Sequence, residues 1–128
     1  MNTIKSFRRG FTIIEIIIVV AIIGLLAAIA IPNFHRARET AQLTTIRQNL
    51  LLIQGAKTQW AISNKKGKKD EPTPAELGKY LKGNALPTPI VDELYLINAV
   101  GESPTATAPI KLMDYPVGRP ISITLPNN

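Results

Sequence analysis

The sequence predicts an α+β fold in which one long N-terminal helix packs against a small antiparallel sheet. Three features of its 128 residues indicate this fold. An apolar run fills residues 11–31, apolar residues recur at helical spacing after it, and nine of the 10 prolines follow residue 70. Because proline interrupts helices and central strands, the last part of the chain is expected to consist of loops and short strands.

The apolar run is long enough to cross a membrane. Only Thr12, Glu15 and Gly24 within it are neither aliphatic nor aromatic. As a helix rising ~1.5 Å per residue, the run covers roughly 30 Å, which is the thickness of a bilayer core. A cleavable secretory signal is the rival interpretation, but its apolar core usually has only about 7 to 15 residues.

Charge predicts the orientation of this span. Three basic residues precede the run, at Lys5, Arg8 and Arg9. The positive-inside rule therefore predicts a single pass with a cytoplasmic N-terminus and with the rest of the chain outside. Formal net charge is +6 for the whole chain. Beyond the span the chain is only mildly basic, which permits contacts with anionic lipid or nucleic acid and requires neither.

Glu15 is the unexpected residue in the span. An ionised carboxylate at mid-bilayer costs about 3 kcal/mol, so it needs a partner or a neutral form. One interpretation is that Glu15 lies near the membrane end and is hydrated or protonated there. The other starts from Gly10: cleavage after it would give Phe11 a new α-amino group one helical turn from Glu15. That ammonium would be a counter-ion within one subunit or between neighbours.

These residues carry a resemblance to a known family. The string RGFTIIE at residues 9–15, followed by an aliphatic run, Gly24 and AIP at residues 30–32, resembles the prepilin signal of type IV pilins and type II secretion pseudopilins. The resemblance implies a pilin-like fold. It also implies that a prepilin peptidase cuts after Gly10 and methylates the amine of Phe11. The leader would then be residues 1–10, and Glu15 would be the acid that registers each incoming subunit.

The resemblance also implies partners and a location. The chain would wait in the inner membrane with a periplasmic C-terminal domain, and then join a periplasmic or surface filament. Its partners would be copies of itself or other pilin-like subunits, the peptidase, and an assembly platform with its ATPase. In that family the work is mechanical, so the resemblance implies a protein without a cofactor and without enzymatic activity.

The helix is expected to continue beyond the membrane. Residues 11–32 would form the membrane or filament-core half, and residues 33–63 an amphipathic half. Pro32 is predicted to bend it, because proline removes one helical donor, and Gly24 is a second soft point. One apolar stripe, for the chain's own domain, is formed by Leu43, Ile46, Leu50, Ile53 and Trp60. A second stripe, for other subunits, is formed by Phe34, Ala37, Ala41 and Leu52.

Residues 64–128 are expected to form the small domain. They begin with a turn that carries Lys65, Lys66, Lys68 and Lys69, a solvated loop or a candidate anion contact. Thr73 to Glu76 has the form of a capping box and predicts a short helix to about Lys82, with Leu77, Tyr80 and Leu81 packed on the long helix. Strands are predicted at residues 94–99, 109–113 and 121–125.

Residues for other chemistry are missing. The chain has no Cys, which excludes disulfides and thiolate sites, and its single His, at position 35, has no second His to complete a metal set. The acids Asp92, Glu93, Glu102 and Asp114 are spaced too widely to predict a calcium site. A Gly-rich phosphate loop and a nucleophile elbow are also absent. The sequence therefore predicts no catalytic residues and no metal.

The leading functional hypothesis is a structural subunit of a type II secretion pseudopilus-like filament. A short C-terminal domain without a disulfide favours this class within the resemblance. The alternative is a type IV or competence pilin that binds DNA, through the four lysines, for uptake or adhesion. The lysine turn lacks interleaved aromatics, so nucleic acid is not the favoured partner. A third hypothesis is a membrane anchor that never polymerises.

Overall fold

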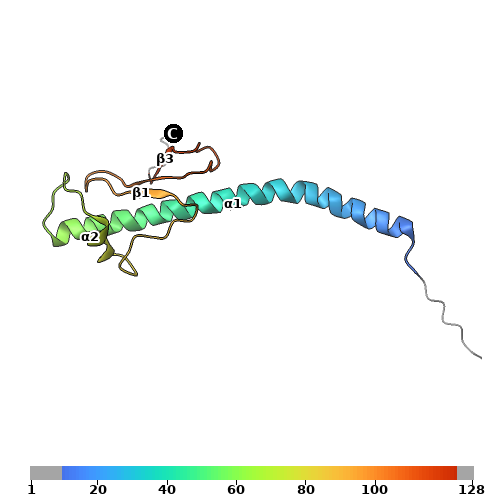
Figure 1. The fold of residues 1–128 in the computed structure, drawn as a ribbon, viewed down its shortest axis with the longest axis horizontal. Coiled ribbons are helices and arrows are strands. Elements are labelled where there is room, and N and C mark those ends of the chain that lie inside the picture. Colours follow the sequence, from blue (N-terminus) through green and yellow to red (C-terminus); the bar gives the residue numbers. More distant parts are fainter. Residues whose placement is uncertain (1–9, 124–128) are drawn as a thin grey trace, which may run out of the picture. The chain divides into compact units, whose positions relative to one another are not determined.

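The computed structural model describes residues 10–123, which form two helices and three strands. Helix α1 runs from Ile13 to Ser63 and α2 from Pro74 to Gly78, followed by β1 (Leu94–Leu96), β2 (Thr105–Thr107) and β3 (Pro120–Ser122) (Figure 1). The chain divides between His35 and Arg36 into two units. The predicted α+β class, with one long helix and a small antiparallel sheet, is confirmed.

Helix α1 was predicted over residues 11–63 and is found over 51 residues, starting two residues later. Pro32 lies inside it and the helical assignment is unbroken there. A helix can continue through a proline when the following residues have strong helical periodicity, as they do here. The bend predicted at Pro32 and the soft point at Gly24 remain predictions.

The first unit holds the apolar part of α1, and nothing in that unit covers it. Every large apolar side chain from Phe11 to Phe34 is more than half exposed. This part of α1 is long and apolar enough to cross a membrane, and none of its most apolar stretch is buried. So large an apolar surface is not stable in water, so in the working protein lipid or other protein must surround it.

The second unit is a three-stranded antiparallel sheet packed on the rest of α1. The strand order is β1-β2-β3, and Tyr95, Ala106 and Ile121 lie in register across it. Because side chains alternate along a strand, this row points to one face. Ala106 and Ile121 are fully buried and pack with Leu43, Ile46 and Leu50 of α1. The neighbouring row, which contains the exposed Leu94, lies on the other face.

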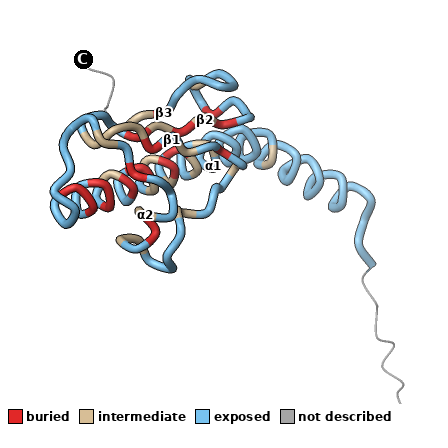
Figure 2. Tube along the Cα trace, turned by 60° about the vertical axis from the view of Figure 1, so that its left-hand side comes forward, coloured by how far each residue is buried: buried red, intermediate tan, exposed pale blue. Residues whose placement is uncertain are grey.

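The core has two adjoining clusters along one face of α1. The first contains the sheet residues and Leu112, and the second joins Ile53, Ala56 and Trp60 of α1 to Leu77 and Ile97. Figure 2 shows the buried turns of α1 beside the strands. The five residues predicted to face the chain's own domain are all buried, and Phe34 and Leu52 of the second stripe are 68% and 57% exposed. The first stripe is therefore confirmed.

One predicted strand was wrong, and the other two are shorter than predicted: β1 ends at Leu96 and not at Ala99, and β3 ends at Ser122. Residues 109–113 form no strand: they belong to the β2–β3 loop (residues 108–119), in which Leu112 and Tyr115 make an isolated bridge. Apolar Ile110 and Leu112 suggested a strand, but Pro109 and the positive φ of Met113 (50°) turn the chain. The true middle strand, β2, was missed because its sequence, Thr-Ala-Thr, is short and weakly apolar. The predicted residues 124 and 125 lie outside the described residues.

Helix α2 is shorter than predicted, ending at Gly78 and not near Lys82. Its start was predicted correctly: Thr73 and Glu76 form a capping box, and Pro74 is the first helical residue. Its last residue must be glycine, since a Cβ on Gly78 would lie 2.5 Å from the carbonyl oxygen of Asn84, and the chain continues in turns after it. Leu77 is buried on α1, and Tyr80 and Leu81 are half-buried beside it, as predicted.

We predict that Ile46→Ala will lower the free energy of unfolding of the second unit by about 2 to 5 kcal/mol, because Ile46 is fully buried between α1 and the sheet. Leu52→Ala is the matched control on the exposed face, with an expected change of about 0.5 kcal/mol or less. Denaturant titration of the full chain in detergent, followed by the fluorescence of Trp60, the only tryptophan, measures both. Equal effects would contradict the observed orientation of α1.

Candidate functional site

Glu15 is hydrogen-bonded to Thr12 at the N-terminus of α1. Its Oε2 accepts hydrogen bonds from the backbone N–H of Thr12 (2.8 Å) and from Thr12 Oγ1 (3.0 Å). In return, Thr12 Oγ1 accepts from the backbone N–H of Glu15 at 3.3 Å. This reciprocal pair is a capping box, which satisfies two of the four free N–H groups at a helix start.

The sequence contained the signal for this cap, and it was missed. Thr12-Ile13-Ile14-Glu15 is the same Thr-x-x-Glu pattern that was recognised at Thr73. The cap shows that Glu15 has partners within its own chain. The predicted pairing with the amine of Phe11 remains a prediction.

The predicted processing site lies just before α1. Gly10 and Phe11 are both exposed, and neither belongs to the helix. A peptidase needs an extended, accessible backbone, so the position of this peptide bond is compatible with cleavage. Residues 1–9 of the predicted leader lie outside the described residues.

The four candidate lysines share one exposed turn after α1. Lys65, Lys66, Lys68 and Lys69 are all exposed, and Asp70 closes the turn through a 2.7 Å hydrogen bond from the Gly67 N–H. The Lys66 ammonium lies 5.9 Å from the Trp60 ring centre. The turn therefore presents charge in an ordered loop, and its anion contact remains a prediction.

One lysine was not predicted to matter. Lys57 is fully buried beneath the β1–β2 connection, and its Nζ donates to the carbonyl oxygens of Ile97 and Glu102, each at 2.7 Å. Burial lowers the pKa of Lys57, and the nearby charges of Glu102 and Glu71 oppose that shift. The side chain fastens the connection to α1. Sequence periodicity did not single it out, because lysine is rarely buried.

Glu93 is the second buried charge, and it organises the start of β1. Its carboxylate accepts hydrogen bonds from the N–H groups of Ile90 and Val91, at 2.9 Å each, and from the Tyr95 hydroxyl. Asn49 of α1 donates to that hydroxyl at 2.9 Å. Burial raises the pKa of Glu93, but these hydrogen bonds outweigh it and hold the pKa below its ordinary value. Burial also raises the pKa of Tyr95.

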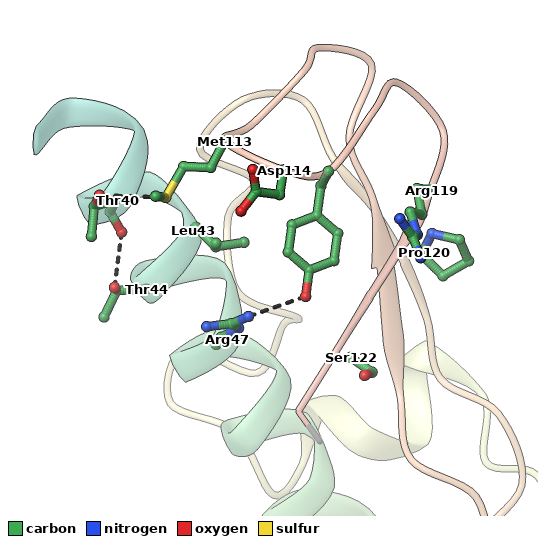
Figure 3. A pocket seen from close by; sticks show the side chains of 10 residues that line it. Thr40, Leu43, Thr44, Arg47, Met113, Asp114, Arg119, Pro120 and Ser122 are labelled. Atoms are coloured by element: carbon green, nitrogen blue, oxygen red, sulfur yellow. Dashed lines mark hydrogen bonds between the residues drawn. The ribbon is translucent and has the colours of Figure 1, made fainter. Parts of the chain in front are cut away.

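A groove of about 610 Å³ separates α1 from the β2–β3 loop. Figure 3 shows Arg47 pointing from α1 into the groove. The Arg47 Nη2 donates to the Tyr115 hydroxyl at 3.1 Å, and the guanidinium lies 5.9 Å from the ring centre. Nearby, the Met113 sulfur lies 3.4 Å from the Thr40 hydroxyl oxygen. Contacts across the groove therefore link the loop to the helix.

The acids weighed as calcium ligands do not gather. Glu93 is engaged by the hydrogen bonds above, whereas Asp114 lines the groove beside Arg47. Among residues 10–123, no three side chains of the types His, Cys, Asp and Glu come close enough to hold a metal ion.

Comparison with known proteins assigns the N-terminal segment. The prokaryotic N-terminal methylation motif matches residues 5–31, which include Gly10, Phe11 and Glu15. Over this segment the chain is similar to the type IV pilin and pseudopilin family. The match contains the cap formed by Thr12 and the exposed apolar part of α1. The resemblance stated from the sequence is therefore confirmed.

Relatives come from both branches of the family. The chain is 41% identical over 64 residues to the type IV major fimbrial protein FimA of Dichelobacter nodosus, covering 50% of this chain and 41% of that protein. It is 34% identical over 92 residues to the type IV major pilin protein PilE1 of Neisseria gonorrhoeae, covering 64% and 52%. The type II secretion system core protein G of Klebsiella pneumoniae is 33% identical over 57 residues, covering 44% and 41%.

These alignments span about half or less of the relatives' own length. No solved structure matches the chain significantly. The family model matches the N-terminal segment, and the alignment to PilE1 also extends into the second unit.

We predict that the second unit will lose stability in acid because Glu93 stabilises it only when ionised. A carboxyl whose pKa is lowered by folding stabilises the fold above its unfolded pKa, here about 4.5, and that contribution is lost as pH falls through the folded pKa. Glu93→Gln should cost about 1 to 3 kcal/mol at neutral pH and flatten the acid dependence.

Asp92→Asn is the matched control, since Asp92 is exposed beside Glu93. Denaturant titrations between neutral and acidic pH measure both variants. An unchanged pH profile in Glu93→Gln would show that another group causes the acid sensitivity.

Proposed function

We propose that the chain is a structural subunit of a type II secretion pseudopilus-like filament. It would be processed after Gly10, held in the membrane by the first part of α1, and assembled through that same helix. The work is mechanical. Its partners would be copies of itself or other pilin-like subunits, with a peptidase, a membrane platform and an ATPase acting on it.

The observation that carries this proposal is the contrast between the two parts of α1. One face of the part from residue 43 to residue 61 is buried against its own domain, whereas every large apolar side chain from Phe11 to Phe34 is exposed. A helix with that much bare apolar surface is suited first to lipid and then to a bundle of identical helices. Both environments satisfy the same side chains, so transfer between them is feasible.

The cap at Thr12 supports the role proposed for Glu15. Its donors belong to residues that remain after cleavage at Gly10, so the carboxylate keeps hydrogen-bond partners in the processed subunit. Those partners are neutral, and the charge remains uncompensated. A cationic amine on the Phe11 of a neighbour would be a stronger partner in a low-dielectric environment. Assembly would then exchange a local hydrogen-bond pair for an ion pair.

The second candidate function is a type IV pilin. It is favoured by the names of several relatives, which are type IV major fimbrial or pilin proteins. The pseudopilus is favoured by the small domain without cysteine and by the relative named protein G. Deleting the gene in its native host separates the two. Loss of secreted proteins would support the pseudopilus, and loss of surface fibres the pilus.

We predict that the protein isolated from its native membrane begins with N-methylated Phe11. Cleavage after Gly10 removes a basic leader and leaves the apolar helix intact. Mass spectrometry of the N-terminal peptide measures this directly. A chain that still begins with Met1, or is cut near Ala30, would exclude prepilin processing.

We predict that Glu15→Leu will remain in the membrane but will be lost from filaments, because it removes the only acidic group between residues 11 and 31. Thr12→Ser is the matched control, since serine preserves the capping hydroxyl. Fractionation of membranes and sheared filaments, followed by quantification of the chain, distinguishes the two. Normal filament incorporation of Glu15→Leu would favour a membrane anchor that does not use this acid.

A further inference from the structure

We infer that the β2–β3 loop docks on the surface of an anionic lipid bilayer, beside the point where α1 leaves it. The inference rests on membrane insertion of residues 11–31, which is one part of the proposed function. It does not depend on filament assembly, and it concerns the subunit before assembly.

The loop holds its shape through internal contacts. Leu112 and Tyr115 exchange two backbone hydrogen bonds of 3.0 and 2.8 Å, and the Gly118 N–H donates to the Ala108 carbonyl oxygen at 3.1 Å. The Leu112 side chain is fully buried in the core with Leu43. The side chains that the loop leaves exposed are therefore presented by a closed, anchored segment.

Those exposed side chains are a mixture of apolar and basic groups. Ile110, Met113 and Val117 are 45%, 38% and 64% exposed. Lys111 and Arg119 are exposed in the same loop. Apolar side chains that enter the headgroup boundary, with basic ones that bind lipid phosphates, are the composition of segments that lie on membranes.

Contacts with α1 attach the loop to Glu39 and Thr40, which follow the apolar run closely in the sequence. The Met113 N–H donates to Glu39 Oε2 at 3.2 Å, and the Thr40 hydroxyl contacts the Met113 sulfur at 3.4 Å (Figure 3). Glu39 follows Ile31, the last residue of the apolar run, by eight residues. Along a helix that is only about 12 Å, whatever the angle between the two units. The headgroup layer occupies roughly 5 to 8 Å on each side of the hydrocarbon core.

The charge of this region suits an anionic surface. Arg36 lies one turn before Thr40, and its carbonyl oxygen accepts from the Thr40 hydroxyl at 2.9 Å. The region contains four cations and two acids. The cations are Arg36, Arg38, Lys111 and Arg119, and the acids are Glu39 and Asp114. The lysine-rich turn cannot substitute for them, because Ser63 lies about 36 Å beyond Glu39 along α1. The β2–β3 loop combines cations with exposed apolar side chains and contacts α1 at residues 39 and 40, close to the end of the apolar run.

The experiment uses single-cysteine labelling, which is clean because the chain has no cysteine. Val117→Cys in the full chain is labelled with an environment-sensitive fluorophore and reconstituted into vesicles of phosphatidylcholine, alone or with an equal amount of phosphatidylglycerol. Spin-labelled lipid is the quencher. We expect several-fold stronger quenching at position 117 in the vesicles with phosphatidylglycerol than at the distant control, Ser63→Cys.

Charge reversal tests the cause. Lys111→Glu with Arg119→Glu should abolish the extra quenching, whereas Lys68→Glu with Lys69→Glu, the same charge change in the distant turn, should preserve it. Trp60 fluorescence verifies that the variants fold. Quenching at position 117 that equals the Ser63→Cys control, or that is insensitive to both phosphatidylglycerol and the reversal, would overturn the inference.

A label at Val20→Cys separates this result from failure of the anchor. If position 20 is quenched and position 117 is not, membrane docking of the loop is wrong while insertion of α1 stands. If position 20 is also unquenched, the anchor is wrong and the inference falls with it. Cross-linking between copies at position 117, without lipid quenching, would overturn docking and assign the loop to a contact between subunits.

Discussion

The structure depends on one constraint: a single helix must satisfy two environments. From residue 43 to residue 61 it buries one face against its own sheet, and from Phe11 to Phe34 its large apolar side chains are bare. Nothing in the first unit covers them. The small domain therefore stabilises only its own part of α1, and the rest obtains its stability from lipid or from other subunits. The membrane insertion and assembly proposed for this chain would follow from this division.

Glu15 is an acidic group in an apolar segment, and local hydrogen bonds stabilise it there. Its hydrogen bonds with Thr12 satisfy the start of α1 and the carboxylate together, so the isolated subunit holds the acid in a fixed position. Hydrogen bonds to neutral groups leave the charge itself uncompensated. The Glu15 carboxylate therefore has hydrogen-bond partners within its own chain, and a nearby cation would stabilise it further. That combination suits a group whose proposed role is to recognise an incoming subunit.

Sequence periodicity predicted the elements that have regular patterns, and it missed the features that depend on tertiary contacts. The long helix, its buried stripe and the cap at Thr73 could be found because each has a repeating or local signature. The strand at Thr105 could not, since three weakly apolar residues become a strand only when β1 and β3 pair with them. Lys57 and Glu93 were missed because burial of a charge is decided by partners far along the chain.

These two buried charges do the structural work that cysteines do in many small extracytoplasmic domains. Lys57 ties the connection between β1 and β2 to α1 through two carbonyl oxygens. Glu93 fixes the entry to β1 and, through Tyr95, is linked to Asn49 of α1. Both attach an irregular segment to the long helix. Such polar links are weaker than a disulfide but are indifferent to redox conditions, and each is broken by removal of one partner. A domain with three short strands and no cysteine therefore depends on the helix for its packing and for its loop geometry alike.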